Sequence, residues 1–388
     1  MRSSPMFLRR RLRAGSGSEG EEENGTVLTS ADPAACTAWC LARTRELGFA
    51  AAGVCDASPS KRSGELRAWL DGGRHGPMDW MQAHIDVRVD PARIVPGTQS
   101  VLIAAARYHD GRPDARSASA DVGSAAALGR VARYARGADY HRVMKRRLRT
   151  LQRELEAALP GTRGKVCCDI EPVPERELAE RAGIGRIGKN TLLIADGLGS
   201  WTVLASYFTT ARLQPTVRED ATDPCGTCTR CIDACPTAAI SPWSVDASRC
   251  ITTVTIEQRS LPESEVASKV GDWLFGCDIC QEVCPHNQPT RHSRRMGVDQ
   301  AWDGRSAAFS LRDVLQWNQI SRRAAMGASA LTRVHAPQAR RNAVWCALDV
   351  LRQNPKHPLR RDLESIAADE GDDPQVRHAA KTVLEMTR

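Results

Sequence analysis

The cysteines of this chain are the residues whose spacing most clearly indicates chemistry. There are 14 of them, and four follow the pattern C-x2-C-x2-C-x3-C directly before a proline: Cys225, Cys228, Cys231 and Cys235. Bacterial ferredoxins bind 4Fe–4S clusters with this run, and in two-cluster ferredoxins its fourth cysteine ligates the other cluster. We therefore expect a second set of ligands elsewhere in the chain.

A second set of cysteines follows between residues 250 and 284. Three of them are spaced C-x2-C-x3-C before another proline, and one lies upstream: Cys277, Cys280, Cys284 and Cys250. We expect the two cysteines that precede prolines to exchange clusters. Cluster 1 then takes Cys225, Cys228, Cys231 and Cys284. Cluster 2 takes Cys235, Cys250, Cys277 and Cys280.

Structural zinc is the alternative for these cysteines, because zinc sites also use C-x2-C pairs. Zinc requires neither three cysteines at successive x2 spacings nor a repeated Cys-Pro, so the pattern favours iron–sulfur clusters. Two neighbouring clusters would conduct single electrons. Their presence alone does not identify what the electrons reduce.

A glycine-rich segment offers a weaker signal. Gly183, Gly185 and Gly188 match G-x-G-x-x-G, and Lys189 extends the match toward a phosphate-binding loop. A dinucleotide motif should follow a strand, whereas the preceding residues favour a helix, and Asn190 lacks the hydroxyl that would bind Mg²⁺. We interpret the segment as a tight turn that lets the backbone approach a flat or bulky ligand.

Acid–base chemistry has one candidate at the end of a predicted strand. Asp169 could act as a general acid if burial raises its pKa, and a turn-forming aspartate is the structural alternative. The preceding Cys167 and Cys168 are expected to include a buried thiol. Asp139 and His141 begin like a D-x-H-x-x-G cobalamin loop, but Met144 occupies the glycine position. His141 is therefore expected to begin a helix rather than to ligate cobalt.

A basic run occupies residues 130–149. It is either a solvated helix face or a surface for a phosphate backbone. Its members are Arg130, Arg133, Arg136, Arg142, Lys145, Arg146, Arg147 and Arg149.

Length and composition limit the possible number of domains and the class of protein. The length of 388 residues predicts two to three domains, and 41% hydrophobic with 26% charged residues is ordinary for a globular protein. Lys and Arg number 54 against 46 Asp and Glu, a mild excess that is compatible with a polyanionic partner. No apolar run is long enough to span a membrane, and we expect no membrane partner. Without a secretory signal, a reducing cytoplasmic compartment is expected, where cysteines serve as metal ligands or buried thiols.

The helices and strands that must position these residues are predicted to lie in successive segments of the chain. Residues 1–33 are expected to form a disordered extension. An α+β domain is predicted over residues 34–215 from alternating helix and strand patterns. Its main elements are helices at 34–47 and 139–159 and strands at 49–55, 100–106 and 165–170.

The remaining chain divides into two segments. Residues 216–300 contain the clustered cysteines and little periodicity, which favours a ferredoxin-like module. Residues 301–388 become helical again and end in a Pro-started helix beside antiparallel neighbours, a pattern that resembles HEAT repeats. The predicted helices are 338–353, 359–368 and one that begins at Asp373-Pro374.

Five segments, taken in order, resemble the epoxyqueuosine reductase family. The resemblance runs from about Ala34 to the C-terminus, and the ordered combination is specific. The segments are YARGADYH at 134–141, CDIEPVPER at 168–176, AGIGRIGKN at 182–190, CGTCTRCIDACP at 225–236 and FGCDICQEVCP at 275–285.

The resemblance implies a cobalamin-dependent oxidoreductase. Its N-terminal domain would have a fold like that of flavin nitroreductases and would bind cobalamin. The family's proton-donating aspartate corresponds to Asp169, and its cobalamin-contacting arginine corresponds to Arg88. Apolar contacts to the corrin correspond to Leu193 and Leu204, and Ile251 is expected at the same face.

The implied activity is reduction of epoxyqueuosine to queuosine in the anticodon loop of tRNA. Electrons would pass from an external low-potential donor through the two clusters to cobalamin. Asp169 would protonate the departing oxygen, and Arg259, Arg340 and Arg341 would contact the tRNA. A monomer is expected.

Two alternatives to this activity are a reductive dehalogenase-like cobalamin enzyme for a small molecule and a non-catalytic ferredoxin-type electron carrier. The lack of an evident export signal argues against the dehalogenase. The large N-terminal domain argues against the carrier, since two clusters do not require it.

Overall fold

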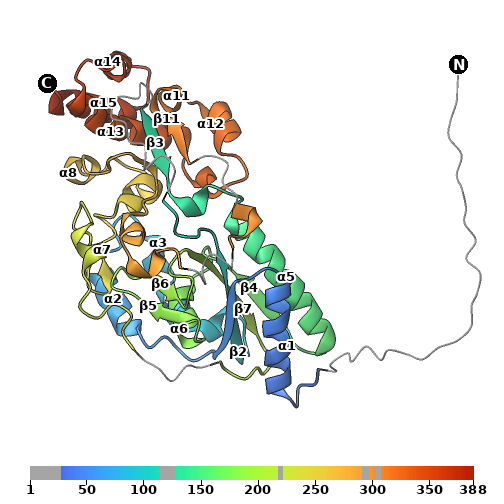
Figure 1. The fold of residues 1–388 in the computed structure, drawn as a ribbon. Coiled ribbons are helices and arrows are strands. Elements are labelled where there is room, and N and C mark those ends of the chain that lie inside the picture. Colours follow the sequence, from blue (N-terminus) through green and yellow to red (C-terminus); the bar gives the residue numbers. More distant parts are fainter. Residues whose placement is uncertain (1–27, 114–126, 217–221, 291–296, 303–306) are drawn as a thin grey trace, which may run out of the picture.

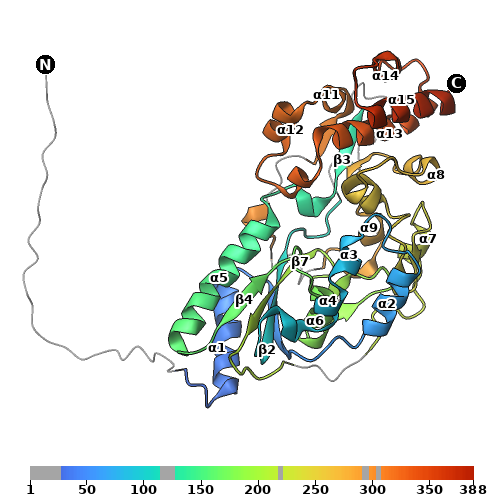
Figure 2. The same ribbon diagram turned by 180° about the vertical axis from the view of Figure 1, so that it is seen from behind.

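A computed structural model describes residues 28–113, 127–216, 222–290, 297–302 and 307–388. Most of the extension predicted over residues 1–33 therefore lies outside the described residues. A sheet flanked by helices occupies one end of the molecule and a set of helices the other (Figures 1 and 2). Among the described residues, no helix combines the length and the hydropathy that a membrane span requires.

The central sheet has four strands in the order β1-β2-β7-β4, and all of its pairs are antiparallel. The strands are β1 (Ala51–Asp56), β2 (Ser100–Arg107), β7 (Thr202–Thr209) and β4 (Gly164–Cys167). Every residue of β2 is buried. A strand covered on both faces needs a near-continuous apolar run rather than an alternating pattern, which is why this segment was predictable.

Two long helices cover one face of the sheet. They are α1 (Pro33–Glu46) and α5 (Tyr140–Ala158), and each begins at an aspartate whose side chain accepts a backbone N–H: Asp32 for α1 and Asp139 for α5. Apolar residues of α5 such as Leu148 and Leu151 pack into a core with Leu102 and Tyr207 of the sheet. Both helices were predicted to within one or two residues of these bounds.

Shorter elements cover the opposite face of the sheet. Helix α6 (Glu175–Arg181) packs there with the hairpin of β5 (Gly185–Ile187) and β6 (Leu193–Ala195). The glycine motif crosses this hairpin. A Cβ at Gly185 would lie 2.2 Å from the carbonyl oxygen of Ile194, so only glycine permits this close approach. Three further helices follow β1 along the chain: α2 (Ser63–Asp71), α3 (Trp80–Ala83) and α4 (Ile85–Val89).

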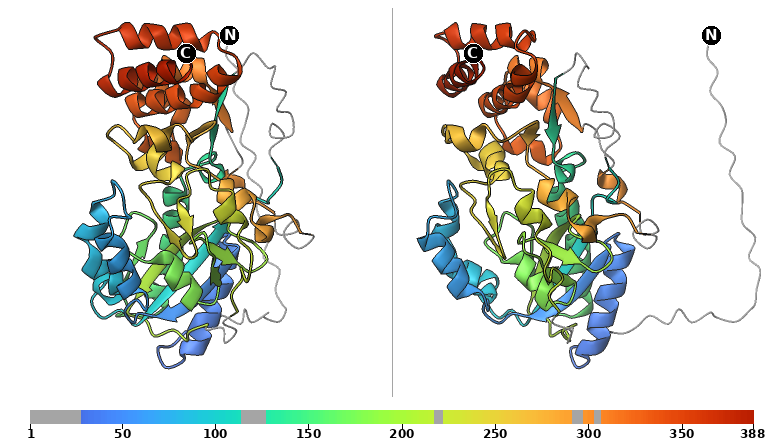
Figure 3. Two further views of the ribbon diagram at one scale, coloured as in Figure 1. Left: turned by 90° about the vertical axis from the view of Figure 1, so that its left-hand side faces the viewer. Right: turned by 60° about the vertical axis from the view of Figure 1, so that its left-hand side comes forward.

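The cysteine-rich segment contains only short elements. They are α7 (Arg230–Asp233), β8 (Ile240–Ser241), β9 (Ser244–Val245), a π-helical turn η3 (Thr253–Glu257), α8 (Ser264–Ala267), β10 (Trp273–Phe275) and α9 (Ile279–Glu282). Strand β10 pairs in parallel with β3 (Leu128–Val131), which also pairs with β11 (Ala308–Ser310). This small sheet joins three distant parts of the chain, and the segment lies between the two ends of the molecule (Figure 3).

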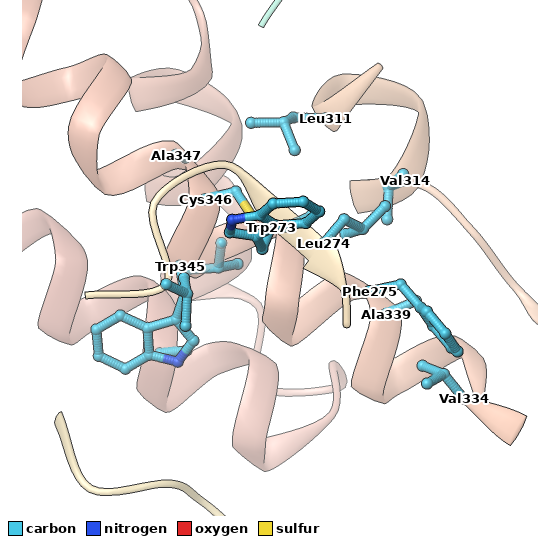
Figure 4. Packing of buried hydrophobic residues seen from close by; sticks show 14 of the residues in the cluster. Trp273, Leu274, Phe275, Leu311, Val314, Val334, Ala339, Trp345, Cys346 and Ala347 are labelled. Carbon is cyan, nitrogen blue, oxygen red and sulfur yellow. The ribbon is translucent and has the colours of Figure 1, made fainter. Parts of the chain in front are cut away.

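The C-terminal helices share a core with the cysteine-rich segment. They are α11 (Leu311–Leu315), α12 (Gln319–Met326), α13 (Ala336–Gln353), α14 (Leu359–Ala368) and α15 (Pro374–Met386). Trp273 and Phe275 of β10 are buried against residues of α11 and α13, among them Leu311 and Cys346 (Figure 4). One continuous core therefore fixes these helices relative to the cysteine loops.

Candidate active site and cluster-binding loops

All 14 cysteines are free thiols in the structure. Electrostatic interactions separate the eight clustered ones into two sets. Burial raises the pKa of Cys284, and the neighbouring charges that raise it further are those of Cys225, Cys231 and Cys228. The pKa of Cys231 is raised by burial and by Cys225 and Cys228. Cys284 therefore lies with the three cysteines of the first run, although more than 50 residues separate them.

The second set forms around Cys277. Burial raises its pKa, and the cysteines that act on it are Cys250 and Cys235. Cys280 interacts with Cys277 and Cys250, and it also interacts with Cys231 of the first set. Cys235, the fourth cysteine of the first run, thus lies with the second set. The electrostatic interaction between Cys280 and Cys231 indicates that the two sets are neighbours.

The donor chemistry of these sets fits 4Fe–4S clusters. Each thiolate of such a cluster binds a different iron, so its four sulfurs need not converge on one point. Among the described residues, no group of three His, Cys, Asp or Glu side chains is placed to hold a single metal ion. Backbone N–H groups do face the sulfurs, since Lys189 donates to Sγ of Cys225 at 3.3 Å and Ala239 donates to Sγ of Cys235 at 3.4 Å.

Lys189 clamps the first cysteine loop. Its ammonium group donates to the carbonyl oxygens of Gly226 at 2.6 Å and Cys228 at 3.1 Å, and it lies over the ring of Trp243. The side chain is only 8% exposed. The sequence suggested a turn for this segment but assigned no function to its lysine. The P-loop-like spacing was the sequence signal that could have identified Lys189 as a binding residue. The group that its side chain binds is a peptide loop rather than a phosphate.

Asp169 lies directly after β4, where the chain turns. Its φ of 62° is left-handed, a conformation that aspartate tolerates better than most residues. The hydroxyl of Tyr140 donates to its Oδ2 at 2.7 Å, and Nε2 of His141 lies 3.1 Å from the same atom. The side chain is 56% exposed. Desolvation by neighbouring atoms opposes its ionisation, but these two contacts lower the pKa of Asp169 below its usual value. In this state the carboxyl group is ionised near neutral pH, unlike the neutral acid that the sequence suggested.

Further ionisable groups surround Asp169. Glu175 accepts the backbone N–H of Asp169 at 3.2 Å, and burial together with the charge of Asp169 raises the pKa of Glu175 to about 8. Arg333 forms an ion pair with Glu257, and its charge acts on Asp169 from the C-terminal part of the chain. The site can therefore hold protons on several groups. Tyr140, His141 and Glu175 were not predicted to be residues of this site. They lie in the segments DYH at 139–141 and PER at 174–176, which belong to the motifs that carry the family resemblance.

The structure places Arg88 at this site as well. Burial lowers its pKa, and the charges that act on it are those of Asp169, Glu175 and Arg176. Its Nε is buried and has no hydrogen-bond partner among the described residues. A guanidinium group in this position can bind an oxygen of a polar ligand.

The three predicted apolar contacts are not equivalent. Leu193 is buried and Leu204 is partly buried, and both pack in the core beneath α6. Ile251 follows Cys250 and packs in the separate core of the C-terminal helices. Leu204 retains partly exposed surface, whereas a ligand could reach Leu193 or Ile251 only if neighbouring atoms moved.

Two of the arginines expected to contact tRNA are engaged by other groups of the protein. Arg341 is fully buried, and its guanidinium donates to the carbonyl oxygens of Val254, Gln258 and Ser260, so the predicted phosphate contact is wrong for this residue. Arg340 is also engaged, because it forms a two-pronged ion pair with Asp372. Arg341 is a correction to a prediction that took basic residues to be exposed, whereas the tRNA contact of the partly exposed Arg340 stays a prediction.

Arg259 and the basic run have mixed environments. Arg259 is exposed, but it donates to Gln338 and to the carbonyl oxygen of Arg333. In the run, Arg133 is buried against Asp278 and Glu282. The exposed members lie on one face of α5, opposite its apolar face, and Arg153 extends them. They are Arg142, Arg146, Arg149 and Arg153.

Comparisons with known proteins agree with this arrangement. Residues 88–170 match the family described as "Epoxyqueuosine reductase QueG, DUF1730", and residues 224–287 match the "4Fe-4S double cluster binding domain". The epoxyqueuosine reductase of Synechococcus sp. strain RCC307 is 39% identical over 310 residues, which cover 76% of this chain and 89% of that protein.

Two solved structures have the same fold. An epoxyqueuosine reductase from Bacillus subtilis superposes with a TM-score of 0.74 at 23% identity, over 90% of this chain and 98% of that chain. An epoxyqueuosine reductase crystallised with an epoxyqueuosine-modified tRNA-Tyr stem loop gives a TM-score of 0.71 at 24% identity, with the same coverage.

A mixed helix-and-sheet fold with a double-cluster domain beside a site rich in proton-holding groups defines an iron–sulfur oxidoreductase. Within that class, the chain belongs to the epoxyqueuosine reductase family.

Proposed function

We propose that this protein reduces epoxyqueuosine to queuosine in the anticodon loop of tRNA, with electrons relayed through two 4Fe–4S clusters. Family membership supports the substrate. The observation that carries the proposal is the placement of Asp169, with its hydrogen-bonded Tyr140 and His141, in a chain that also brings eight cysteines together as two sets.

The cluster ligands follow from the thiol sets. Cluster 1 binds Cys225, Cys228, Cys231 and Cys284. Cluster 2 binds Cys235, Cys250, Cys277 and Cys280. The interaction between Cys280 and Cys231 supports transfer of single electrons between neighbouring clusters. An external low-potential one-electron donor supplies them.

Cobalamin is the cofactor that the family resemblance implies, and the residues around Asp169 fit a large polar ligand. Arg88, with its unpartnered buried Nε, would hold an oxygen of the cofactor, and Leu204 would contact the corrin. Contacts of Leu193 and Ile251 with the corrin would require neighbouring atoms to move. When bound, cobalamin supplies a strongly reducing cobalt for reduction of the epoxide.

Asp169 then has the role of general acid toward the departing oxygen. It must be protonated before each transfer, because its resting pKa is low. The surrounding Arg88, Arg176 and Arg333 favour the ionised carboxylate after the transfer. Tyr140 fixes the orientation of the carboxyl group through its hydroxyl.

The division of the chain is part of the proposal. Residues 34–215 form a nitroreductase-like domain that binds cobalamin, residues 216–300 form the ferredoxin-like module and residues 301–388 form HEAT-like helices. The packing of α13, α14 and α15 against one another supports the last assignment. The protein acts as a monomer in the cytoplasm.

The exposed arginine face of α5 would bind the tRNA backbone. It starts with Arg142, directly after the residue that contacts Asp169, and extends to Arg153, about 16 Å along the helix axis. Within the described residues, no carboxylate forms an ion pair with Arg142, Arg146 or Arg149. An RNA strand whose modified base reaches Asp169 could therefore continue along this face.

Mass spectrometry of tRNA nucleosides from a strain that lacks this gene tests the function. Accumulation of epoxyqueuosine, reversed by the wild-type gene but not by one encoding Asp169→Asn, is the expected result. Unchanged queuosine in the deletion strain would remove the proposal.

A further inference from the structure

His141 occupies a position between two carboxylates. Its Nδ1 lies 2.7 Å from Oδ1 of Asp139, and its Nε2 lies 3.1 Å from Oδ2 of Asp169. Asp139 is the N-cap of α5 and also accepts the backbone N–H of His141. It therefore holds this residue at both its backbone and its imidazole ring. The ring of Tyr140 stacks on it with centroids 4.0 Å apart. Geometry of this kind fixes both the orientation of the ring and the direction of any proton transfer.

The side chain of His141 retains contact with water. It is 18% exposed, and the side chain of Asp169 is 56% exposed. The proposed function places Asp169 against the cofactor and the substrate, which would cover it and leave His141 as its route to solvent. An imidazole that keeps contact with solvent and lies between two carboxylates can take up a proton and pass one on.

The proposed reaction requires more protons than one carboxyl group holds. Conversion of an epoxide to an alkene breaks two C–O bonds, forms the second C–C bond and releases the oxygen as water. It consumes two electrons, which the external one-electron donor supplies through the clusters, and two protons. Asp169 can give one proton and must be reprotonated before it can give the second.

We propose that His141 is the proton relay of this site, which resupplies Asp169 through Nε2 while Asp139 holds Nδ1. When Asp169 has given its proton to the oxygen, the Nε2–H of the imidazolium transfers to the carboxylate. The neutral imidazole then takes a proton from solvent. His141 acts through Asp169 and does not touch the substrate. The inference rests on the proposed reduction of epoxyqueuosine.

The charges around the ring agree with this role. Burial alone would lower the pKa of His141, but its contacts with Asp139 and Asp169 raise it to about 9. The imidazole is therefore protonated near neutral pH and loses its proton as the pH rises through about 9. The charged and titratable groups that face His141 or its partner Asp169 are Asp139, Tyr140, Arg142, Glu175, Arg88, Arg176 and Arg333.

Two variants separate relay from structure. His141→Gln removes the proton-carrying ring. Asp139→Asn keeps a good helix cap but removes the charge that holds the imidazolium. His378→Gln, on the exposed surface of α15, is the matched control. Each purified holoprotein is assayed from pH 6 to 10 on epoxyqueuosine-containing tRNA, and iron and cobalamin contents are measured for each.

Wild type should lose kcat as the pH rises through about 9, and Asp139→Asn should lose it at a lower pH because its imidazolium is less stabilised. His141→Gln should lower kcat about 100-fold or more with little change in KM, and imidazole added to His141→Gly should restore part of the rate. In NMR spectra, the ring signal that disappears in His141→Gln should titrate near pH 9 in wild type and lower in Asp139→Asn.

Three results would overturn the relay. They are wild-type kcat in His141→Gln, an unshifted pH profile and ring titration in Asp139→Asn, or a loss of rate in His141→Gly that imidazole does not restore and that accompanies lost cofactor. An inactive wild type would instead overturn the proposed function, and the relay with it.

Discussion

The backbone N–H of Lys189 donates to Sγ of Cys225, and its ammonium group holds the loop in which that cysteine lies. This contact joins the glycine turn of the N-terminal domain to the first cysteine run. Hydrogen bonds and positive charge near cluster sulfurs stabilise the reduced, more negative form and so raise the reduction potential. We therefore expect Lys189 to affect the reduction potential of the proposed cluster 1 more than that of the proposed cluster 2.

Replacement of this lysine tests that effect. Lys189→Met should make the reduction potential of cluster 1 more negative and leave cluster 2 unchanged, because the charge is lost on one side only. Redox titration followed by electron paramagnetic resonance measures both. Lys381→Met, exposed on α15, is the control, and a Lys189→Met protein with full iron content and an unaltered cluster 1 would contradict the assignment.

Asp169→Asn should lower kcat about 100-fold or more, since the amide cannot give a proton to the departing oxygen. Asparagine can still accept from Tyr140, so the loop and the cofactors should be retained. Single-turnover assays with measured iron and cobalamin contents check this, beside Asp79→Asn, whose side chain is 92% exposed. Full activity in Asp169→Asn would remove Asp169 as the acid.

The exchange of ligands between clusters is testable by pairing variants. Cys284→Ser should lose the same cluster as Cys225→Ser, and Cys235→Ser should lose the same cluster as Cys277→Ser. Iron analysis and the remaining paramagnetic signal identify the cluster that survives, and Cys346→Ala controls for loss of a buried thiol outside the loops. If Cys284→Ser instead matched Cys277→Ser, each run would serve its own cluster.

The arginine face of α5 makes a prediction about salt. Arg146→Ala combined with Arg149→Ala should weaken tRNA binding and reduce the slope of log affinity against log salt by about one per lost phosphate contact. Binding is measured at several salt concentrations with cluster-loaded protein. Arg67→Ala combined with Arg93→Ala removes two other exposed arginines and should leave the slope unchanged. Equal slopes in the two double variants would place the RNA elsewhere.

Arg341 should behave as a structural residue. Arg341→Met leaves the carbonyl groups of Val254, Gln258 and Ser260 without this donor, and the free energy of unfolding should fall by about 3 kcal/mol. Urea unfolding measures this, with the exposed Arg361→Met as control. The salt dependence of tRNA binding by folded Arg341→Met should not change. A reduced slope with normal stability would restore the original expectation of a phosphate contact.

Local patterns predicted much of the fold. The bounds of α1, α5, α13 and α14 follow from helical periodicity and end signals, and β2 follows from an apolar run, because each depends on neighbours in sequence. The strand predicted over residues 165–170 ends earlier, at Cys167, since the chain turns at Asp169 with a positive φ. That turn aims the carboxyl group at α5.

The site itself was less predictable. The contact between His141 and Asp169 joins residues 28 positions apart, and no periodicity reports it. The burial of Arg341 has a similar cause, because the carbonyl group of Val254 in the π-helical turn at Thr253–Glu257 accepts from this donor, which is 87 positions away in the sequence. In a sequence, a charged residue is expected to be exposed. Tertiary contacts determine where His141 and Arg341 actually lie, and the sequence alone does not reveal those contacts.

The central claim is tested most directly by incubating the purified, anaerobically prepared holoprotein with epoxyqueuosine-containing tRNA and a one-electron reductant, then measuring tRNA nucleosides by mass spectrometry. Queuosine should appear as epoxyqueuosine disappears. Unchanged epoxyqueuosine, in a protein whose two clusters are fully reduced and whose cobalamin is retained, would contradict it.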